Sequence, residues 1–438
     1  MTVKNKLKSS SILVLVMMIS SLTMFAQSTD ALSTYTPYSL FGLGQMDTDG
    51  SAYNLSLGGA GIGMRDNRFI NYTNPAAVTA RDSLSFMFDF SINQKNMYNS
   101  DGKRRSAYNV FNVQNVALTM PIWRSSAFIL GIQPFSNVGY KFSGKEKNDD
   151  IVSNIGDVTY EKYGTGSIYQ LFAGAGVTFW KRLSIGAEAI YYFGYIDRHS
   201  NILFNSSPAC NNLLTGWDYK VHCFSGKFGI QYAQPFKKNN SELIVGGTYR
   251  IGNSMRGDIV RYAYSNGVNS KYNDTIVFDR RNDIDLRIAD EFGVGISYKQ
   301  KNKWTVGFDY IQQNWQNSSF AVHSDKINFE PVTARYYKLG FEITPNIYDI
   351  RYYMKKVTYR VGTYFEQSYL KINGNQVNAF GVTLGASFPI LKYYNAITVV
   401  INAGQRGSLK HNNVRERFIN FTVGINLHDI WFVKYRYE

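Results

Sequence analysis

Few residues of this 438-residue chain stand at spacings that could support chemistry. The chain has five histidines, none of which pairs with cysteine, aspartate or glutamate at metal-ligand spacing: His199, His222, His323, His411 and His428. The run Gly59-x-Gly61-x-Gly63 lacks the strand–helix unit of a dinucleotide loop, and no Gly-x-Ser-x-Gly elbow occurs. The sequence therefore predicts no metal, no cofactor and no enzymatic activity.

The first residues predict export. Lys4, Lys6 and Lys8 precede an apolar run over 12–25, and Ala26 with Gln27 offers a cleavage point. This is the pattern of a secretory signal peptide over residues 1–26. An uncleaved anchor is the alternative, but the run is short for one. In an exported chain the only two cysteines, Cys210 and Cys223, are predicted to form a disulfide, or to stay free thiols in a reducing niche.

The composition favours a membrane barrel. Aromatic residues make up 16% of the chain, glycine is abundant at 37, proline is scarce at 9, and the mean hydropathy is −0.25. A transmembrane β-barrel needs an apolar residue only at every second strand position, so its mean hydropathy stays low. The formal charge of +15 does not indicate nucleic acid, because the chain is exported and its basic residues are dispersed.

Fourteen segments alternate apolar and polar residues, as half-buried strands do. They are 84–93, 109–120, 127–136, 167–179, 183–196, 220–235, 242–251, 286–298, 304–315, 334–344, 357–368, 378–389, 396–405 and 417–427. The gaps after even-numbered segments are mostly short, with a longer one near 345–356, and those after odd-numbered segments are mostly long and polar. Outer-membrane barrels show this asymmetry of periplasmic turns and external loops. We expect a 14-stranded antiparallel transmembrane barrel in the outer membrane of a Gram-negative bacterium.

The alternation also predicts which face meets lipid. In a barrel the apolar face points outward, and a lysine or arginine facing lipid at mid-membrane costs about 2–4 kcal/mol. Eight charges fall on the polar face and should line the lumen: Glu188, Lys227, Arg250, Glu291, Asp309, Lys338, Glu342 and Arg360. They are expected to form ionic staples such as Glu342 with Arg360, or else a polar track for substrate headgroups. The basic short turns would contact lipid phosphates, or serve solubility alone.

Two flanking segments complete the domain organisation. Residues 27–82 are glycine-rich with scattered apolar residues and are predicted to plug the lumen of the barrel at 83–427, although a disordered periplasmic tail is the alternative. Residues 428–438 follow the last strand as a periplasmic tail. Its basic and aromatic residues could bind a protein partner or pack on the barrel rim: Trp431, Phe432, Lys434 and Arg436.

Two stretches resemble the FadL-type outer-membrane transporters of long-chain fatty acids and other hydrophobic compounds. Residues 58–78 resemble that family's N-terminal plug, and 291–315 resemble one of its hairpins. The plug features are Gly59, Gly61, Asp66, Asn74, Pro75 and Ala76. Residues 130–140 are similar to the family's kinked third strand, which implies a lateral opening at Gly131 and Pro134. The external loop 252–285 is polar, however, and offers no apolar capture groove.

Two functions remain open from the sequence. The first is passive uptake of hydrophobic small molecules such as fatty acids, with a plug and a lateral exit into outer-membrane lipid. The second is a non-transporting subunit or shuttle of an outer-membrane protein complex, such as type IX secretion or assembly machinery, with a periplasmic or outer-membrane protein partner.

A closed barrel should be heat-modifiable. We expect the unboiled protein to migrate faster than the boiled protein on an SDS gel, because a folded barrel resists detergent and stays compact. A circular dichroism spectrum dominated by helix would contradict the fold.

Overall fold

The computed structural model describes residues 32–82, 85–205, 210–236, 240–266, 273–282, 286–318, 328–390, 394–411 and 414–430. The chain divides into two units, Met1–Leu32 and Ser33–Glu438. The predicted signal peptide and the tail residues Trp431, Phe432, Lys434 and Arg436 lie outside the described residues. No helix in the described ranges is long and apolar enough to cross a membrane.

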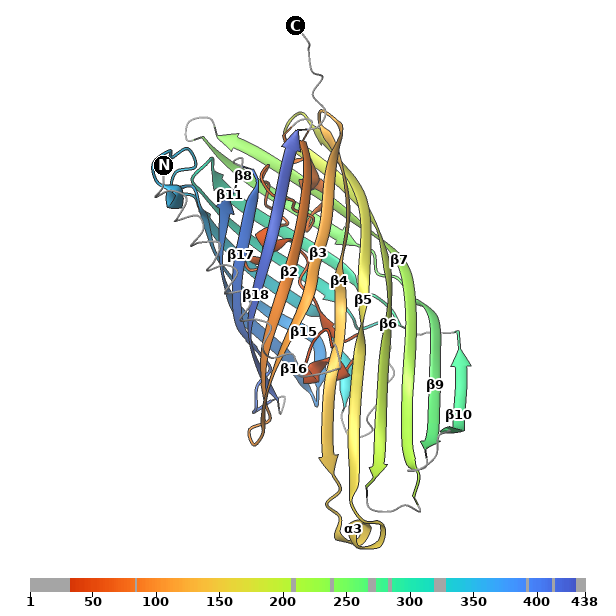
Figure 1. The fold of residues 1–438 in the computed structure, drawn as a ribbon. Helices are drawn as coiled ribbons and strands as arrows, with labels where there is room; N and C mark the ends of the chain where they lie inside the picture. Colours follow the sequence, from red (N-terminus) through yellow and green to blue (C-terminus); the bar gives the residue numbers. More distant parts are fainter. Residues whose placement is uncertain are drawn as a thin grey trace, which may run out of the picture. The chain divides into compact units, whose positions relative to one another are not determined.

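Fourteen antiparallel strands form a closed barrel (Figure 1), as predicted. The strands are β2(Ser85–Ser100), β3(Arg105–Trp123), β4(Ser126–Lys145), β5(Val158–Phe179), β6(Leu183–Phe204), β7(Asn212–Phe236), β8(Ser241–Arg250), β11(Asp290–Gln300), β12(Trp304–Asn314), β14(Ala334–Ile343), β15(Thr358–Ile372), β16(Asn375–Pro389), β17(Ala396–Arg406) and β18(Arg415–Ile430). Each strand pairs with the next in this order. β18 pairs with β2 from Arg415↔Ser100 to Ile430↔Ser85, which closes the ring.

The barrel exposes its apolar face and buries its polar face. On β6, Ile185 is 44% exposed and Glu188 only 5%; on β12, Phe308 is 42% exposed and Asp309 is fully buried. This inverts the arrangement of a soluble protein, and it fits a wall whose outer surface meets lipid. The apolar residues of 417–427 lie on the same exposed side, since Ile419, Phe421 and Ile425 are all exposed.

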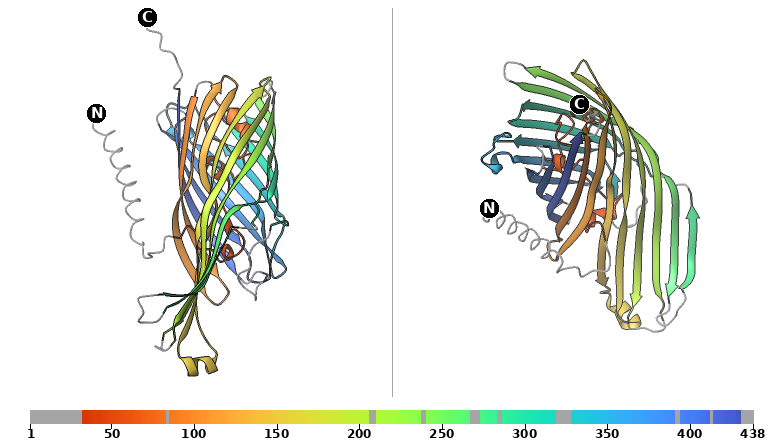
Figure 2. Two further views of the ribbon diagram at one scale, coloured as in Figure 1. Left: turned by 90° about the vertical axis from the view of Figure 1, so that its right-hand side faces the viewer. Right: turned by 45° about the horizontal axis from the view of Figure 1, so that its top comes forward.

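Much of the sequence that was predicted to form external loops forms β-strands in the structure. β5, β6 and β7 have 22, 22 and 25 residues, whereas a tilted strand needs only about 9–11 to cross a membrane. Their excess length, with part of β4, forms a sheet that continues past β2, β3 and β18 (Figures 1 and 2). β9(Arg256–Asn266) and β10(Asn273–Arg281) extend this sheet from β7, and α3(Asp149–Ile155) joins β4 to β5 at its tip. The apolar residues of β9 and β10 stand in short runs, such as Ile259–Val260 and Ile276–Phe278, so alternation of hydropathy does not detect these strands.

Residues 33–82, called the lumenal segment below, lie inside the barrel (Figure 1). The segment contains η2(Pro37–Leu40), β1(Gln45–Met46), α2(Ala52–Leu55) and η3(Pro75–Thr79). It presses its backbone against wall positions occupied by glycine. A Cβ on Gly186 would lie 2.4 Å from the carbonyl carbon of Pro75, and one on Gly362 would lie 2.1 Å from the nitrogen of Gly58.

These wall glycines stand beside one another across neighbouring strands. Gly176 pairs with Gly186 and Gly186 with Gly229, while Gly340 pairs with Gly362 on the far wall. A side chain at any of these positions would occupy the space of the lumenal segment. The two rows of glycines therefore allow the segment to pack against the wall.

Gly186→Val should therefore displace residues 74–76 from the wall. We expect single-channel conductance in planar bilayers to rise from near zero to discrete steps. The matched control is Gly226→Val on β7, whose added Cβ would meet no atom closer than 3.7 Å. Equal conductance in both variants would contradict the packing of the segment against Gly186.

Candidate functional site

The barrel wall is open on one side between β3 and β4. Their pairing ends at Val116↔Ile132, whereas β4 and β5 stay paired to Lys145↔Thr159. A bulge lies between Pro134 and Ser136 at the start of the opening. Gly131 lies below it and still pairs with Ala117, so the opening begins nearer to Pro134 than to Gly131.

The start of the lumenal segment occupies this opening. β1 pairs with β4 through Gln45↔Asn137 and Met46↔Ser136, and the Thr36 N–H donates to the Gly139 carbonyl at 3.0 Å. On the other side, the Asn112 amide on β3 donates to the Ser33 carbonyl at 2.7 Å. Tyr35 stacks on Tyr108 with centroids 4.2 Å apart. The segment thus bridges the two strands that part.

Two acids after β1 hold this part of the segment to cations of the wall. Asp47 accepts from the Lys95 ammonium on β2 at 2.7 Å. Asp49 lies 3.9 Å from both Lys227 and Arg250, and it accepts from Gln133 and Gln170 at 2.9 and 3.0 Å. The segment therefore supplies counter-charges for cations of the lumen wall.

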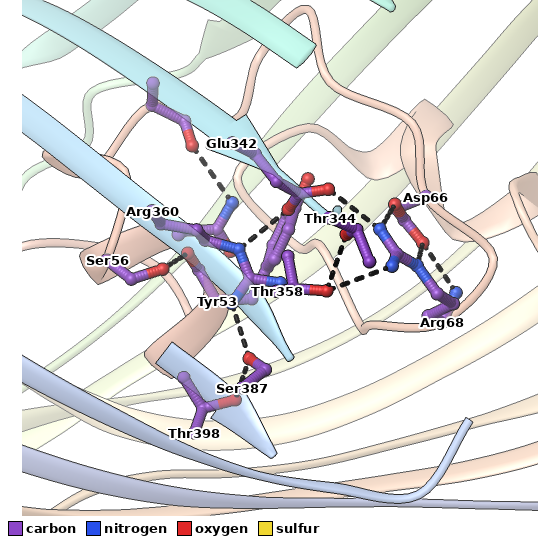
Figure 3. Close-up of polar contacts among 12 residues, drawn as sticks. Tyr53, Ser56, Asp66, Arg68, Glu342, Thr344, Thr358, Arg360, Ser387 and Thr398 are labelled. Atoms are coloured by element: carbon purple, nitrogen blue, oxygen red, sulfur yellow. Dashed lines mark hydrogen bonds and ion pairs between the residues drawn. The ribbon is translucent and has the colours of Figure 1, made fainter. Parts of the chain in front are cut away.

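A second network joins the segment to β14 and β15 (Figure 3). The Arg360 guanidinium donates to Glu342 at 2.7 Å across the register pair Glu342↔Arg360, which confirms the predicted staple. Arg68 of the lumenal segment donates to the other Glu342 oxygen at 2.8 Å and to Asp66 at 2.7 Å. Arg360 also packs over the rings of Tyr53 and Phe69, with centroids 4.8 and 4.6 Å away.

The charge of Asp66 depends on this network. Burial alone would raise the pKa of Asp66, but Arg68 and Lys299 outweigh it and hold that pKa well below its ordinary value. Asp66 therefore remains ionised over the physiological pH range.

The predicted plug residues make specific contacts with the wall. The backbone N–H groups of Gly61 and Ile62 donate to the Asp309 carboxylate at 2.6 and 2.8 Å. The Asn74 amide donates to the Ile62 carbonyl at 2.9 Å, and its oxygen accepts from Ala76 N–H, which caps η3. Pro75 occupies the first turn of η3, where a missing N–H costs nothing.

All eight predicted lumen charges are buried on the inner face. Glu342 forms an ion pair with Arg360, and Glu291 forms one with Arg250 at 2.8 Å. The Lys338 ammonium donates to the Gly59 carbonyl at 3.3 Å. Glu188 faces Lys227 in register without a direct ion pair. No group of three metal-ligand residues occurs within the described ranges.

The predicted disulfide is wrong. Both cysteines are free: Cys210 lies just before β7, and Cys223 is buried well along that strand, paired with Tyr192 of β6. About a dozen residues of extended chain between them span far more than the 7 Å that a disulfide allows.

Sequence reasoning missed Asp47, Asp49 and Arg68. A usable signal existed, since Asp47 and Asp49 are acids of the predicted plug in a chain rich in lumen cations. Their partners on β2 and β7, however, depend on how the segment crosses the lumen.

The space left around the segment is small and charged. The cavity beside Thr48 has a volume of about 80 Å³, with Asp47, Asp49, Lys227 and Arg250 in its lining. Sites for small ligands usually measure about 300–1,000 Å³ and are mainly apolar. The volume is below that range, and apolar side chains such as Phe135 and Leu370 line the cavity beside the charged ones.

The sequence matches the BamG family over residues 8–438. The chain belongs to the BamG family. No curated protein sequence matches it.

Solved structures of FadL-type transporters share the fold of this BamG-family chain. The Pseudomonas putida toluene transporter TodX is 12% identical with a TM-score of 0.57, covering 89% of this chain and 100% of its own. A Pseudomonas aeruginosa FadL homologue is 11% identical with a TM-score of 0.54, covering 88% of this chain and 99% of its own. The Ralstonia pickettii toluene transporter TbuX is 14% identical with a TM-score of 0.54, covering 87% of this chain and 98% of its own. The resemblance seen in the sequence therefore holds for the fold, while the family is BamG.

The Arg360–Glu342 pair should contribute strongly to stability. Arg360→Met leaves a buried carboxylate with one cation fewer, so we expect the free energy of unfolding in urea to fall by about 3–5 kcal/mol. Glu342→Gln combined with Arg360→Met should cost less than the sum of the two single changes. Lys371→Met, which breaks an exposed 2.7 Å pair with Glu330, is the control and should cost about 0–1 kcal/mol.

Proposed function

We propose that this BamG-family barrel is a non-transporting, non-enzymatic subunit of an outer-membrane protein complex. The observation that carries this proposal is that residues of the chain itself block both paths that a transported molecule could take. The lumenal segment occupies the lumen, and its first residues fill the opening between β3 and β4.

The energetics of passage support the same function. A hydrophobic molecule could leave through the side opening only if residues 33–47 moved. That movement would break the β1–β4 pairing and the Asp47–Lys95 ion pair, whose side chains are 9% and 6% exposed. An uncompensated buried charge costs several kcal/mol, so the closed state should dominate. Membership in the BamG family rather than among the named transporters adds weight to a role with protein partners.

The sheet beyond the membrane supports an assembly role as well. Strands β4 to β7, with β9 and β10, continue past the length needed to cross a bilayer. Transport alone does not require this sheet, whereas a complex could use its exposed surface. The predicted tail handle, with Trp431 and Arg436, remains a second candidate contact.

Uptake of hydrophobic compounds, with lateral exit into outer-membrane lipid, is the second candidate function. The parting of β3 from β4 next to Pro134 favours it, as does the FadL-type fold. In this alternative, residues 33–47 would move aside to admit a ligand such as a fatty acid.

Mild-detergent purification followed by mass spectrometry separates the two functions. We expect the native protein to co-purify with outer-membrane or periplasmic proteins at near-equal stoichiometry, and to give no faster uptake of a hydrophobic fluorescent tracer in liposomes. A protein that purifies alone with a bound hydrophobic compound, and that speeds tracer uptake, would favour transport.

A further inference from the structure

The periplasmic end of the barrel carries one loop unlike its neighbours. Turns at this end are short, such as 124–125 and 301–303, but residues 344–357 form a longer loop that contains η5(Tyr353–Lys355). We call this segment the periplasmic loop.

The periplasmic loop is held in one conformation by its own polar groups. The Asp349 carboxylate accepts from the N–H groups of Arg351 and Tyr352 at 2.9 and 2.6 Å. The Asn346 N–H donates to the Lys355 carbonyl at 2.8 Å, and the Tyr353 hydroxyl donates to the Pro389 carbonyl at 2.8 Å. The loop is therefore prearranged before it meets any partner.

This ordered loop presents apolar side chains to solvent. Ile350 at its tip is 98% exposed, and four more large side chains are at least half exposed: Tyr348, Tyr352, Tyr353 and Met354. A rigid loop whose apolar groups are left uncovered by the rest of the chain is the usual mark of a binding surface.

Two adjoining cavities lie beside the loop at the mouth of the lumen. One measures about 260 Å³ and the other about 280 Å³, and Arg68 and Ile347 line both. The first has Phe69, Pro389 and Ala396 in its lining. Together they form a groove, the mouth groove, whose walls include the lumenal segment and inward-facing strand residues.

The mouth groove is strongly basic. Its lining includes five cations and one carboxylate: Arg68, Lys299, Lys301, Lys303, Lys356 and Glu342. Arg68 and Lys299 are already paired with acids of the network. In the part of the chain that the structure describes, no carboxylate lies within ion-pair distance of Lys301, Lys303 or Lys356. The groove thus combines unneutralised positive charge with apolar walls.

We infer that the mouth groove and the periplasmic loop bind an acidic segment of a periplasmic protein that also carries apolar side chains. This inference rests on the proposed function and locates one of its contacts. Carboxylates of the segment would pair with Lys301, Lys303 and Lys356, and its apolar groups would pack on Ile347 and Ile350. The unpaired cations of the groove complement carboxylates, and Phe69, Ile347 and Pro389 in the same lining offer apolar contacts, so we assign the groove to a protein segment.

The test measures binding of a fluorescein-labelled hexapeptide of alternating glutamate and phenylalanine to the full-length barrel in neutral detergent. We expect micromolar binding that weakens with salt, as screening requires. Lys301→Glu with Lys303→Glu should weaken it at least tenfold. The matched control is Lys103→Glu with Arg104→Glu, two exposed residues of the external β2–β3 turn, and should leave binding unchanged.

Equal affinity in both double variants would overturn the inference. So would loss of bound phosphatidylglycerol in Lys301→Glu/Lys303→Glu, seen by native mass spectrometry, together with unchanged peptide binding, because the groove would then be a lipid site. The proposed function is tested separately. If the double variant loses the peptide but native proteins still co-purify fully, the complex stands and this groove is not its contact.

Discussion

The pairing of charges across the lumen is the interaction on which the rest of the structure depends. A barrel of fourteen strands places half of its side chains inside, and here many of them are charged. Arg360, Glu342, Arg250 and Glu291 are almost completely buried. Without partners these groups would oppose folding, since an unpaired buried charge costs several kcal/mol. Within the wall Arg360 pairs with Glu342 and Arg250 with Glu291, and the lumenal segment adds a further partner to each pair, Arg68 to Glu342 and Asp49 to Arg250.

The backbone of the lumenal segment also packs closely against the barrel wall. Glycines on neighbouring strands leave room for the turns around Leu57 and Pro75, and Asp309 then receives two backbone N–H groups. The segment is held by both shape and charge, and the cavity beside Thr48 is correspondingly small, at about 80 Å³. A channel that opens readily would need weaker contacts than these.

This chain of the BamG family shares its barrel fold with FadL-type transporters. FadL-type transporters share the barrel, and the parting of β3 from β4 is a ready-made side opening. In this BamG-family chain the opening is occupied by the start of the lumenal segment, and each end of the barrel carries a further element. One end has the extended sheet, and the other has the ordered periplasmic loop beside a basic groove. Surfaces of this kind suit a barrel that works by contact with other proteins.

The sequence by itself determined the strands and which face of each meets lipid. Alternation in stretches such as 183–196 and 417–427 is a local property, and the cost of charge in lipid leaves only one orientation. The eight lumen charges followed from the same reasoning.

Only the tertiary structure decided what those charges meet, because Arg68 reaches Glu342 across 274 residues of sequence and no local pattern encodes that contact. The same holds for the rows of glycines, which strand register aligns, and for Cys210 and Cys223, which a long strand separates. The external sheet was missed because the apolar residues of β9 and β10 stand in short runs and not at every second position. Local physics thus specified the wall, and long-range packing specified what fills it.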